Sequence, residues 1–304
     1  MPNVVGGVLS FSFYEGLVFG LVAVGVYLTF RVLSFPDLSV DGSFPLGGAI
    51  AAVLIVSGVD PFLATACAFF CGLGSGLLTG LLNTALRIPA LLAGILMMVA
   101  LYSINLRIMD GANVSLLREV TVFDRVAQSL QMSSGSIQVS ITVAVIIAII
   151  VFFVLNWFLR TEVGLALRAT GDNEQMVRAL GSNTNRNILL GTSISNGLVA
   201  LAGAVVAQGQ GFADVGMGIG MIVMGLASVI IGEALIKARG VARLLISVVV
   251  GAFLYRLFIT IAIRLGMAPG DLKLITAVLV IVVLAVPYIR KKIRHEWLPP
   301  AARW

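Results

Sequence analysis

Apolar runs long enough to cross a bilayer recur along the whole 304-residue chain, and they restrict its fold more than any other feature. A span needs about 20 mainly apolar residues, and helices are one of only two structures that satisfy backbone hydrogen bonds in lipid. The chain is 59% hydrophobic and 11% charged, with a mean hydropathy of +1.07, whereas soluble domains carry about 25% charged residues. We therefore expect an all-α polytopic membrane protein.

Nine segments qualify as spans, and we expect them to form a single transmembrane domain over residues 1–304. The segments are roughly 14–30, 43–59, 61–86, 88–106, 137–159, 187–209, 215–236, 243–263 and 272–289. The second is short and rich in glycine, and two aspartates and two prolines lie close to its start. Irregular backbone at membrane depth must be covered by protein or line a wet cavity. Residues 35–45 are therefore predicted to be a break between closely packed helices.

The basic residues predict the orientation of the spans. With residues 160–187 in the cytoplasm, fourteen basic residues fall inside: Arg31, Arg87, Arg160, Arg168, Arg178, Arg186, Lys237, Arg239, Arg243, Arg290, Lys291, Lys292, Arg294 and Arg303. Five fall outside: Arg107, Arg118, Arg125, Arg264 and Lys273. Because cytoplasmic loops carry the excess of positive charge, we expect the N-terminus outside and the C-terminus inside. The basic residues form no single patch, so no nucleic-acid partner is expected.

Two stretches that lie 177 residues apart resemble each other, which predicts an internal repeat. The aligned pairs are Phe35 with Phe212, Asp37 with Asp214, and Gly48 with Gly225. Five spans separate the copies, and an odd number places them in opposite orientations, as in the inverted repeats of many transporters. The halves would cover residues 14–136 and 187–289. The alternative is a chance alignment of glycines in apolar sequence.

Polar residues within the apolar segments are candidates for a solute pathway, because an ionisable group in a membrane faces a cavity or partner more often than lipid. The candidates are Asp37, Ser39, Asn196, Asp214 and Arg256. The alternative for Asp37 and Asp214 is the capping of helix N-termini. For Asp41 we expect a cap on the helix that starts at Gly42. Arg256 has three alternatives besides the pathway: pairing with an acid, extending to the interface, or holding backbone carbonyls.

Other polar residues have simpler predicted roles. Glu233 and Lys237 lie four apart, which suits an ion pair on one helix. Helix-to-helix hydrogen bonding is the expected role of Asn83, Asn105 and Asn156. In the outer loop 107–135, a helix is predicted to lie at the membrane interface with three apolar residues on one face. These residues are Phe123, Val126 and Leu130.

The longest inner hydrophilic segment, residues 160–187, is predicted to contain a short surface helix. Asp172 or Asn173 can cap its start, and it would end near Leu180 with Gly181 as the stop. A short, well-capped surface helix is suited to dock in a groove of a partner protein, and the alternative is an ordinary connecting loop.

This segment resembles the ATPase-contacting loop of ABC importer permeases in the branched-chain amino-acid and ribose-type group. The matching residues are Gly164, Arg168, Ala169, Gly171, Asp172, Asn173, Ala179 and Gly181. A second resemblance lies in the element after the first span: Leu33, Asp37, Leu38, Ser39, Gly42 and Ser43. The likeness is strongest to a bacterial subgroup that pairs with a lipoprotein-type solute receptor, which suggests an aromatic or other amino acid as solute.

The resemblance implies the permease subunit of an ATP-driven importer in the bacterial inner membrane. It implies two ATPase subunits that hold the coupling segment, a second permease copy or close relative, and an extracytoplasmic solute-binding protein. ATP and Mg²⁺ would be bound by the ATPase, because this chain has no Gly-x-x-x-x-Gly-Lys-Ser/Thr motif. No His/Cys metal cluster, nucleophile–base pair or positively charged signal-peptide region is evident, so neither an enzyme, a cofactor site nor a cleaved signal is expected.

Two rival functions remain open in the sequence. An ion-coupled secondary transporter would require an essential intramembrane carboxylate, for which Asp37 and Asp214 are the candidates. A membrane scaffold without transport would tolerate charge reversal in the coupling segment.

Overall fold

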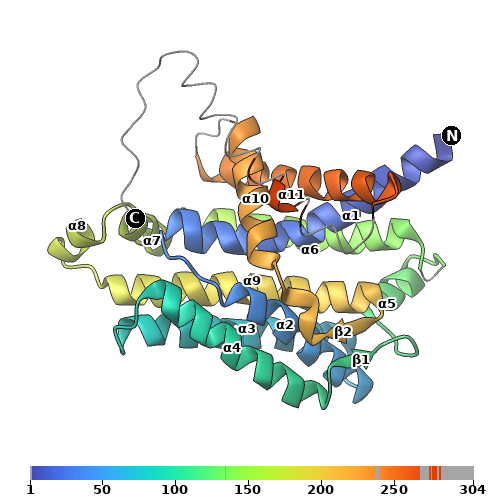
Figure 1. Cartoon of the computed structure of the whole chain (residues 1–304), viewed down its shortest axis with the longest axis horizontal. Coiled ribbons are helices and arrows are strands. Elements are labelled where there is room, and N and C mark those ends of the chain that lie inside the picture. The colour runs from blue at the N-terminus through green and yellow to red at the C-terminus, as the bar shows by residue number, and fades with distance from the viewer. Residues whose placement is uncertain are drawn as a thin grey trace.

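The computed structural model describes residues 2–133, 135–236 and 240–267, with the isolated positions 274, 276–278 and 281. Helices make up most of this part of the chain (Figure 1). They are α1 (Pro2–Tyr27), α2 (Val40–Val56), α3 (Pro61–Thr84), α4 (Ala90–Met109), α5 (Val122–Ser129), α6 (Ile137–Phe158), α7 (Glu162–Asp172), α8 (Glu174–Ala179), α9 (Thr184–Gln210), α10 (Met221–Leu235) and α11 (Val241–Arg264). A π-helical turn, η1 (Leu28–Val32), extends α1, and a 3₁₀ turn, η2 (Val215–Gly218), precedes α10.

The predicted spans agree with the observed helices. Seven described helices are long and apolar enough to cross a membrane, and α2 is a shorter apolar helix. These eight elements correspond in order to the first eight predicted segments. The ninth prediction, 272–289, lies almost wholly outside the described residues. The all-α, multi-span class is confirmed.

The predicted break at 35–45 was placed too late in the chain. The irregular backbone covers residues 33–39, and α2 begins at Val40. The sequence prediction treated Pro45 as part of the break, yet it lies inside α2. A proline removes the hydrogen bond to the carbonyl four residues earlier, here that of Asp41. Gly218 packs against this carbonyl so closely that a Cβ atom would overlap its oxygen.

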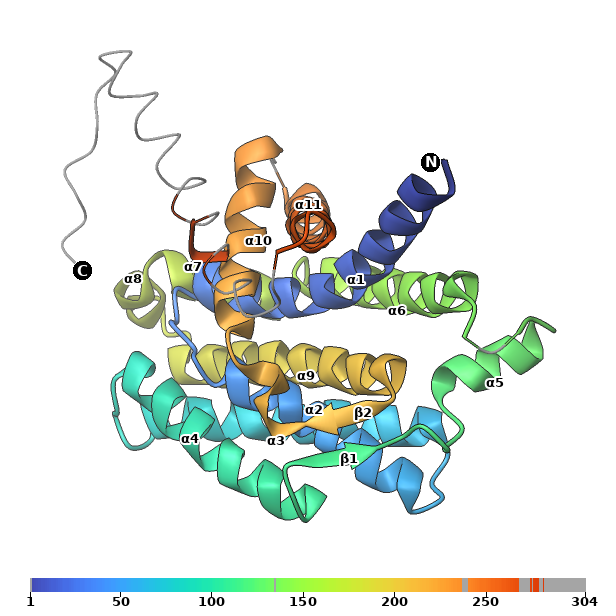
Figure 2. The ribbon, with the colours of Figure 1, turned by 45° about the vertical axis from the view of Figure 1, so that its right-hand side comes forward.

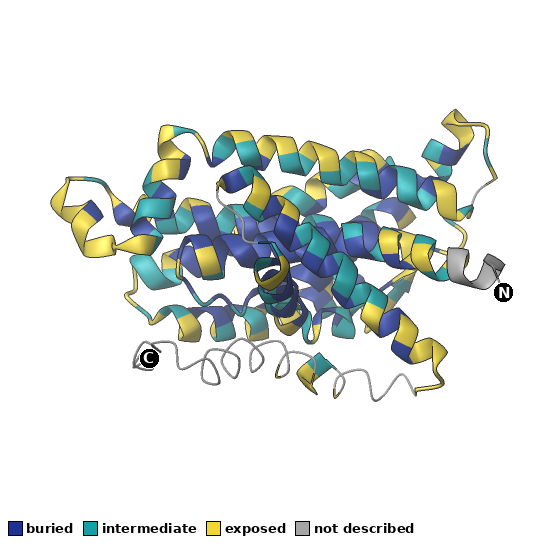
Figure 3. Cartoon of the chain, turned by 90° about the horizontal axis from the view of Figure 1, so that it is seen from above, coloured by how far each residue is buried: buried dark blue, intermediate teal, exposed yellow. Residues whose placement is uncertain are grey.

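Close helix packing surrounds this break. α9 lies along α2 and α3, and α1 lies along α10 and α11. In Figures 1 and 2, α10 crosses the long helices steeply. Glycines allow the close approach: a Cβ on Gly76 of α3 would overlap the Thr192 carbonyl of α9, and one on Gly16 would lie 2.6 Å from the Phe253 Cα. Buried residues accordingly concentrate in the middle of the bundle (Figure 3).

The two ends of the bundle carry different structures. α7 and α8 lie at one end, and α5 lies at the other (Figures 1 and 2). Near α5, two strands that the sequence did not predict, β1 (Asn113–Ser115) and β2 (Phe212–Asp214), pair antiparallel. They join loop 107–135 to the segment after α9.

The helix predicted in loop 107–135 is present as α5, while its position at a membrane interface stays a prediction. Thr121 and Asp124 form a reciprocal capping box at its start. Phe123 is buried, and its ring packs edge-on against Tyr14 of α1 at 6.2 Å. Leu130, which was assigned to the same face, is 46% exposed. The helix therefore packs on the protein itself.

Candidate functional site: the coupling end and the buried polar cluster

The short helix predicted in residues 160–187 is present as α8. Of the two proposed caps, Asn173 is the one observed, because its side chain accepts a hydrogen bond from the Met176 amide at 2.9 Å. α8 ends at Ala179, and Gly181 follows with a φ of +82°, as expected for a glycine stop. The sequence analysis missed α7, which Thr161 caps through the Gly164 amide.

Part of the coupling motif packs α7 onto the bundle. A Cβ on Gly164 would overlap the Phe158 carbonyl, and one on Gly171 would overlap the Val32 carbonyl of η1. Asn187 of α9, which sequence reasoning missed, donates to the Thr170 hydroxyl at 2.8 Å. These contacts hold α7 against η1, which extends the first helix, and against α9.

The rest of the motif faces away from the bundle. Its exposed residues are Asp172, Asn173, Ala179 and Gly181, whereas Arg168 and Ala169 are half-buried. On α8 and its end, Met176 is 53% and Leu180 76% exposed. This end of the protein therefore presents both charged and apolar side chains on α8 and the residue after it.

A second group of polar residues forms a fully buried cluster. The amide and hydroxyl of Ser39 donate hydrogen bonds to Asp37 Oδ1 at 2.8 and 2.6 Å. The Asn196 side chain donates from Nδ2 to Asp37 Oδ2 at 2.8 Å, and its Oδ1 accepts from Ser39 and Ser43 at 3.0 and 2.7 Å. Ser43 also bonds Ser75 at 2.9 Å. The structure thus brings together three of the five predicted pathway residues.

The cluster is closed to solute in this conformation. Asp37, Ser39 and Asn196 each have no exposed surface. Asp37 belongs to the irregular segment 33–39, and Asn196 lies near the middle of α9. The cluster therefore links the break to α9 in the other predicted half.

Asp41 is a cap, but of a different helix from the one predicted. Its carboxylate accepts hydrogen bonds from the amides of Gly220 at 3.0 Å and Ile222 at 2.8 Å. These amides lie at the N-terminus of α10, where unpaired N–H groups and the helix dipole favour a carboxylate. α2 instead has Ser39 at its N-cap. This contact was not predicted because the capping rules consider only residues that are neighbours in sequence, and Asp41 is far from α10 in the chain.

Asp214 lies outside the cluster. Its carboxylate accepts a hydrogen bond from the Gly216 amide at 2.7 Å, and it ends strand β2. The local geometry repeats that of Asp37, whose carboxylate also accepts from the amide two residues later. For Asp214 the structure shows the capping alternative, at the start of η2.

Arg256 also lies outside the cluster, and of its alternatives the structure shows pairing with an acid. Its guanidinium lies 3.7 Å from Glu15 of α1 and 3.3 Å from the centre of the Phe19 ring. Both charged side chains are largely covered, with 16% and 19% exposure. Glu15 was missed, although it is the one acidic residue within the first apolar segment.

The remaining polar predictions have mixed outcomes. Asn105 donates from α4 to the Gly42 carbonyl of α2 at 3.1 Å, which confirms its helix-to-helix role. Asn83 bonds the Ile88 carbonyl within its own turn at 2.8 Å, so that prediction was wrong. Within the described residues, Asn156 Oδ1 is buried without a hydrogen-bond partner. Glu233 pairs with Arg31 at 2.9 Å, while Lys237 lies outside the described residues.

Two cavities lie beside these elements. One of about 450 Å³ lies between α2, α4 and η2 and is lined by Asp41, Met98 and Tyr102 among others. The second, of about 440 Å³, is lined by residues of α10 and α11 that include Arg256. Ile219 lines both cavities. Both volumes fall in the range of about 300–1,000 Å³ that is typical of small-molecule sites.

Comparison with known proteins identifies the family. The family model of the permease component of branched-chain amino acid transport systems matches residues 8–285. A tyrosine transport system permease of Clostridioides difficile is 42% identical over 89% of this chain and 88% of its own. An uncharacterised protein of Rickettsia prowazekii is 32% identical over 91% of this chain and 97% of its own.

More distant relatives belong to the same transport class. The ribose import permease of Escherichia coli K12 is 28% identical over 61% of this chain and 56% of its own. No solved structure matches the chain significantly. The family is a membrane transport component and not an enzyme. The chain belongs to the permease components of the branched-chain amino acid transport systems, and it is the membrane-spanning subunit of an ABC importer.

Proposed function

We propose that this permease imports an aromatic amino acid such as tyrosine. The observation that carries the proposal is the 42% identity to a tyrosine transport permease over nearly the whole of both chains. The 450 Å³ cavity supports it, because Tyr102 and Met98 offer aromatic and polarisable surface to a ring.

The working unit in this proposal contains two permeases, two ATPases and an external solute-binding protein. The exposed α8 and the residue after it offer each ATPase two apolar side chains, Met176 and Leu180, among charged ones. ATP and Mg²⁺ bind to the ATPases. The N-terminus is outside and the coupling end inside, in a bacterial inner membrane. Motion of α7 against η1 and α9 carries ATP-driven closure to the break at residues 33–39.

Uptake of radiolabelled tyrosine by cells tests the function. Cells that lack the gene should lose saturable uptake, and the restored gene should recover it. Unlabelled phenylalanine and tryptophan should compete, whereas leucine and ribose should not. Unchanged uptake in the deletion strain, or competition by ribose alone, would contradict the proposed solute.

The energy source separates ATP-driven import from ion coupling. Uptake should stop when ATP is depleted and continue when an uncoupler removes ion gradients. The Asp37→Asn, Asp214→Asn double variant should keep its dependence on ATP. Uptake that follows the ion gradient, and that this double variant abolishes, would establish the ion-coupled alternative.

A further inference from the structure

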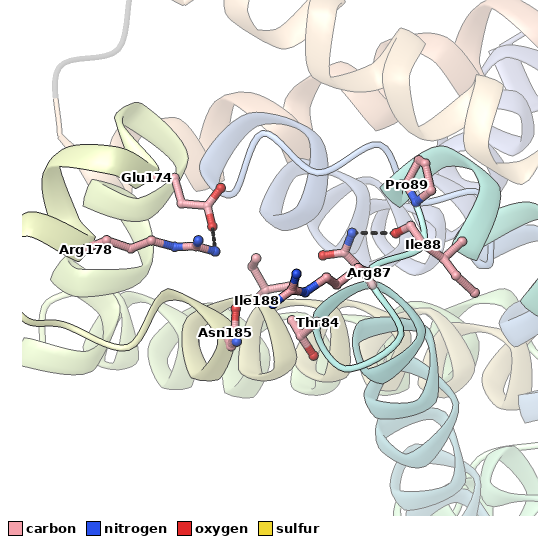
Figure 4. A pocket seen from close by; sticks show the side chains of 9 residues that line it. Thr84, Arg87, Ile88, Pro89, Glu174, Arg178, Asn185 and Ile188 are labelled. Atoms are coloured by element: carbon pink, nitrogen blue, oxygen red, sulfur yellow. Dashed lines mark hydrogen bonds and ion pairs between the residues drawn. The ribbon is translucent and has the colours of Figure 1, made fainter.

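A polar cavity of about 560 Å³ lies beside the coupling helix, and no role has been assigned to it so far. One wall is the end of α3 and the turn before α4, which contribute Asn83 and Arg87. The other wall is α8, which contributes Glu174 and Arg178, while the start of α9 closes the cavity (Figure 4). Two chain segments nearly 90 residues apart thus share one recess at the coupling end.

The Arg87 wall is a turn that presents a cation with no ionic partner in the part of the chain that the structure describes. Arg87 has a left-handed backbone with a φ of +56°, which is uncommon for a residue other than glycine. Asn83 holds the turn through its hydrogen bond to the Ile88 carbonyl. Figure 4 shows the Arg87 side chain extending from the turn toward the Glu174–Arg178 pair. Arg87 is exposed, and within the described residues no ion pair or side-chain hydrogen bond involves it.

On the opposite wall, the charged side chains of Arg178 and Glu174 pair with each other. Arg178 Nη2 binds Glu174 Oε1 at 2.6 Å, and Arg178 Nε donates to the Thr184 hydroxyl at 2.8 Å. That hydroxyl in turn donates to Glu174 at 3.1 Å. Glu174 therefore forms its ion pair with Arg178 and not with Arg87. The recess keeps a net positive charge, because two arginines and one glutamate line it.

We propose that a carboxylate side chain of the partner ATPase enters this recess and pairs with Arg87. Charge complementarity selects an acidic group, and the planar guanidinium suits a two-pronged contact with a carboxylate. The recess is continuous with the exposed surface of α8, so one partner reaches both. This inference rests on the proposed function and extends the ATPase contact from the 164–181 segment to the turn between α3 and α4. A single ATPase then holds two elements of the permease at once.

The test uses the full-length permease co-expressed with its ATPase and purified in mild detergent. Arg87→Glu should retain about tenfold less ATPase, which corresponds to about 1.4 kcal/mol. The loss should be larger at low salt than at high salt, because salt screens exposed charges. Arg243→Glu, at the exposed start of α11, reverses a charge away from the recess and should retain as much ATPase as the wild type. The thermal midpoint of both variants should match the wild type.

A photo-reactive amino acid at position 87 identifies the contacted ATPase residue. Replacement of that acidic residue by arginine should restore binding to Arg87→Glu and weaken binding to the wild type. Undiminished ATPase binding by Arg87→Glu would overturn the inference but leave the proposed function standing. If Arg87→Glu loses bound anionic phospholipid but retains as much ATPase as the wild type, the recess binds a lipid headgroup instead. A wild-type permease that retains no ATPase would refute the proposed function itself.

Discussion

At the scale of single residues, the cluster around Asp37 shows how a carboxylate is accommodated inside this protein. Within the described residues its hydrogen-bond donors are backbone and side-chain amides and a hydroxyl, with no cation among them. A buried polar group left without its partner costs about 1–3 kcal/mol. Asn196→Leu removes the bond to Asp37 Oδ2 and the acceptor of the Ser43 hydroxyl, while Ser39 keeps its bond to Asp37 Oδ1. We expect it to lower stability by about 2–3 kcal/mol.

Thermal unfolding of the purified permease in detergent measures this loss. Thr142→Ala is the matched control, because that hydroxyl makes an exposed bond within α6. It should leave the midpoint nearly unchanged. An Asn196→Leu protein as stable as the wild type would show that the cluster contributes no net stability.

The Asp41 carboxylate is the residue-scale link between α2 and the start of α10. Asp41→Ala removes both hydrogen bonds to the α10 amides, and a lost N-terminal cap costs about 0.5–2 kcal/mol. Asp41→Asn keeps one oxygen acceptor and should lose about half as much. The graded order wild type, Asn, Ala should appear in the thermal midpoints. Equal midpoints for all three would mean that water satisfies these amides equally well.

At the scale of elements, the pairing of α3 with α9 depends on a glycine face. Gly76→Ala places a methyl group against the Thr192 carbonyl, and forced repacking costs about 1–3 kcal/mol. Gly74→Ala on the same helix is the matched control, because no atom lies within 4 Å of its new Cβ. It should be neutral or slightly stabilising, since alanine favours a helix over glycine. A Gly76→Ala protein as stable as the Gly74→Ala control would contradict the close contact between α3 and α9.

The elements also show what local sequence can and cannot predict. The order of the first eight apolar helices, the Asn173 cap and the Gly181 stop depend on composition and nearby residues, and these predictions were confirmed. The first helix, however, starts at Pro2 and not at the predicted residue 14. The start of α2 was predicted too late because Pro45 was expected to lie before the helix. In the structure Ser39 is the N-cap, its amide donates to Asp37, and Pro45 lies within the helix. The pairing of β1 with β2 and the Arg256–Glu15 contact join segments far apart in sequence. No rule that reads along the chain detects such contacts.

At the scale of the whole molecule, the two predicted halves interlock. α1, the first helix of the first half, packs on α10 and α11 of the second half. α9, the first helix of the second half, packs on α2 and α3 of the first half. The aspartates aligned by the predicted repeat, Asp37 and Asp214, also make the same local turn. The inverted repeat itself stays a prediction. The interlocked packing leaves neither predicted half with a separate helical core.

The last prediction concerns which ends of the molecule face which side of the membrane. α5 and α8 lie at opposite ends of the bundle, and Gln128 and Gln175 are exposed on them (Figure 1). In a background with Cys67 and Cys71 replaced by alanine, each glutamine is changed separately to cysteine. Both native cysteines are free and exposed on α3, so their removal should be tolerated. An impermeant maleimide applied to spheroplasts should label Gln128→Cys at once and Gln175→Cys only after the membrane is opened. The reverse pattern would invert the predicted orientation, and labelling of both from one side would contradict the placement of α5 and α8 at opposite ends.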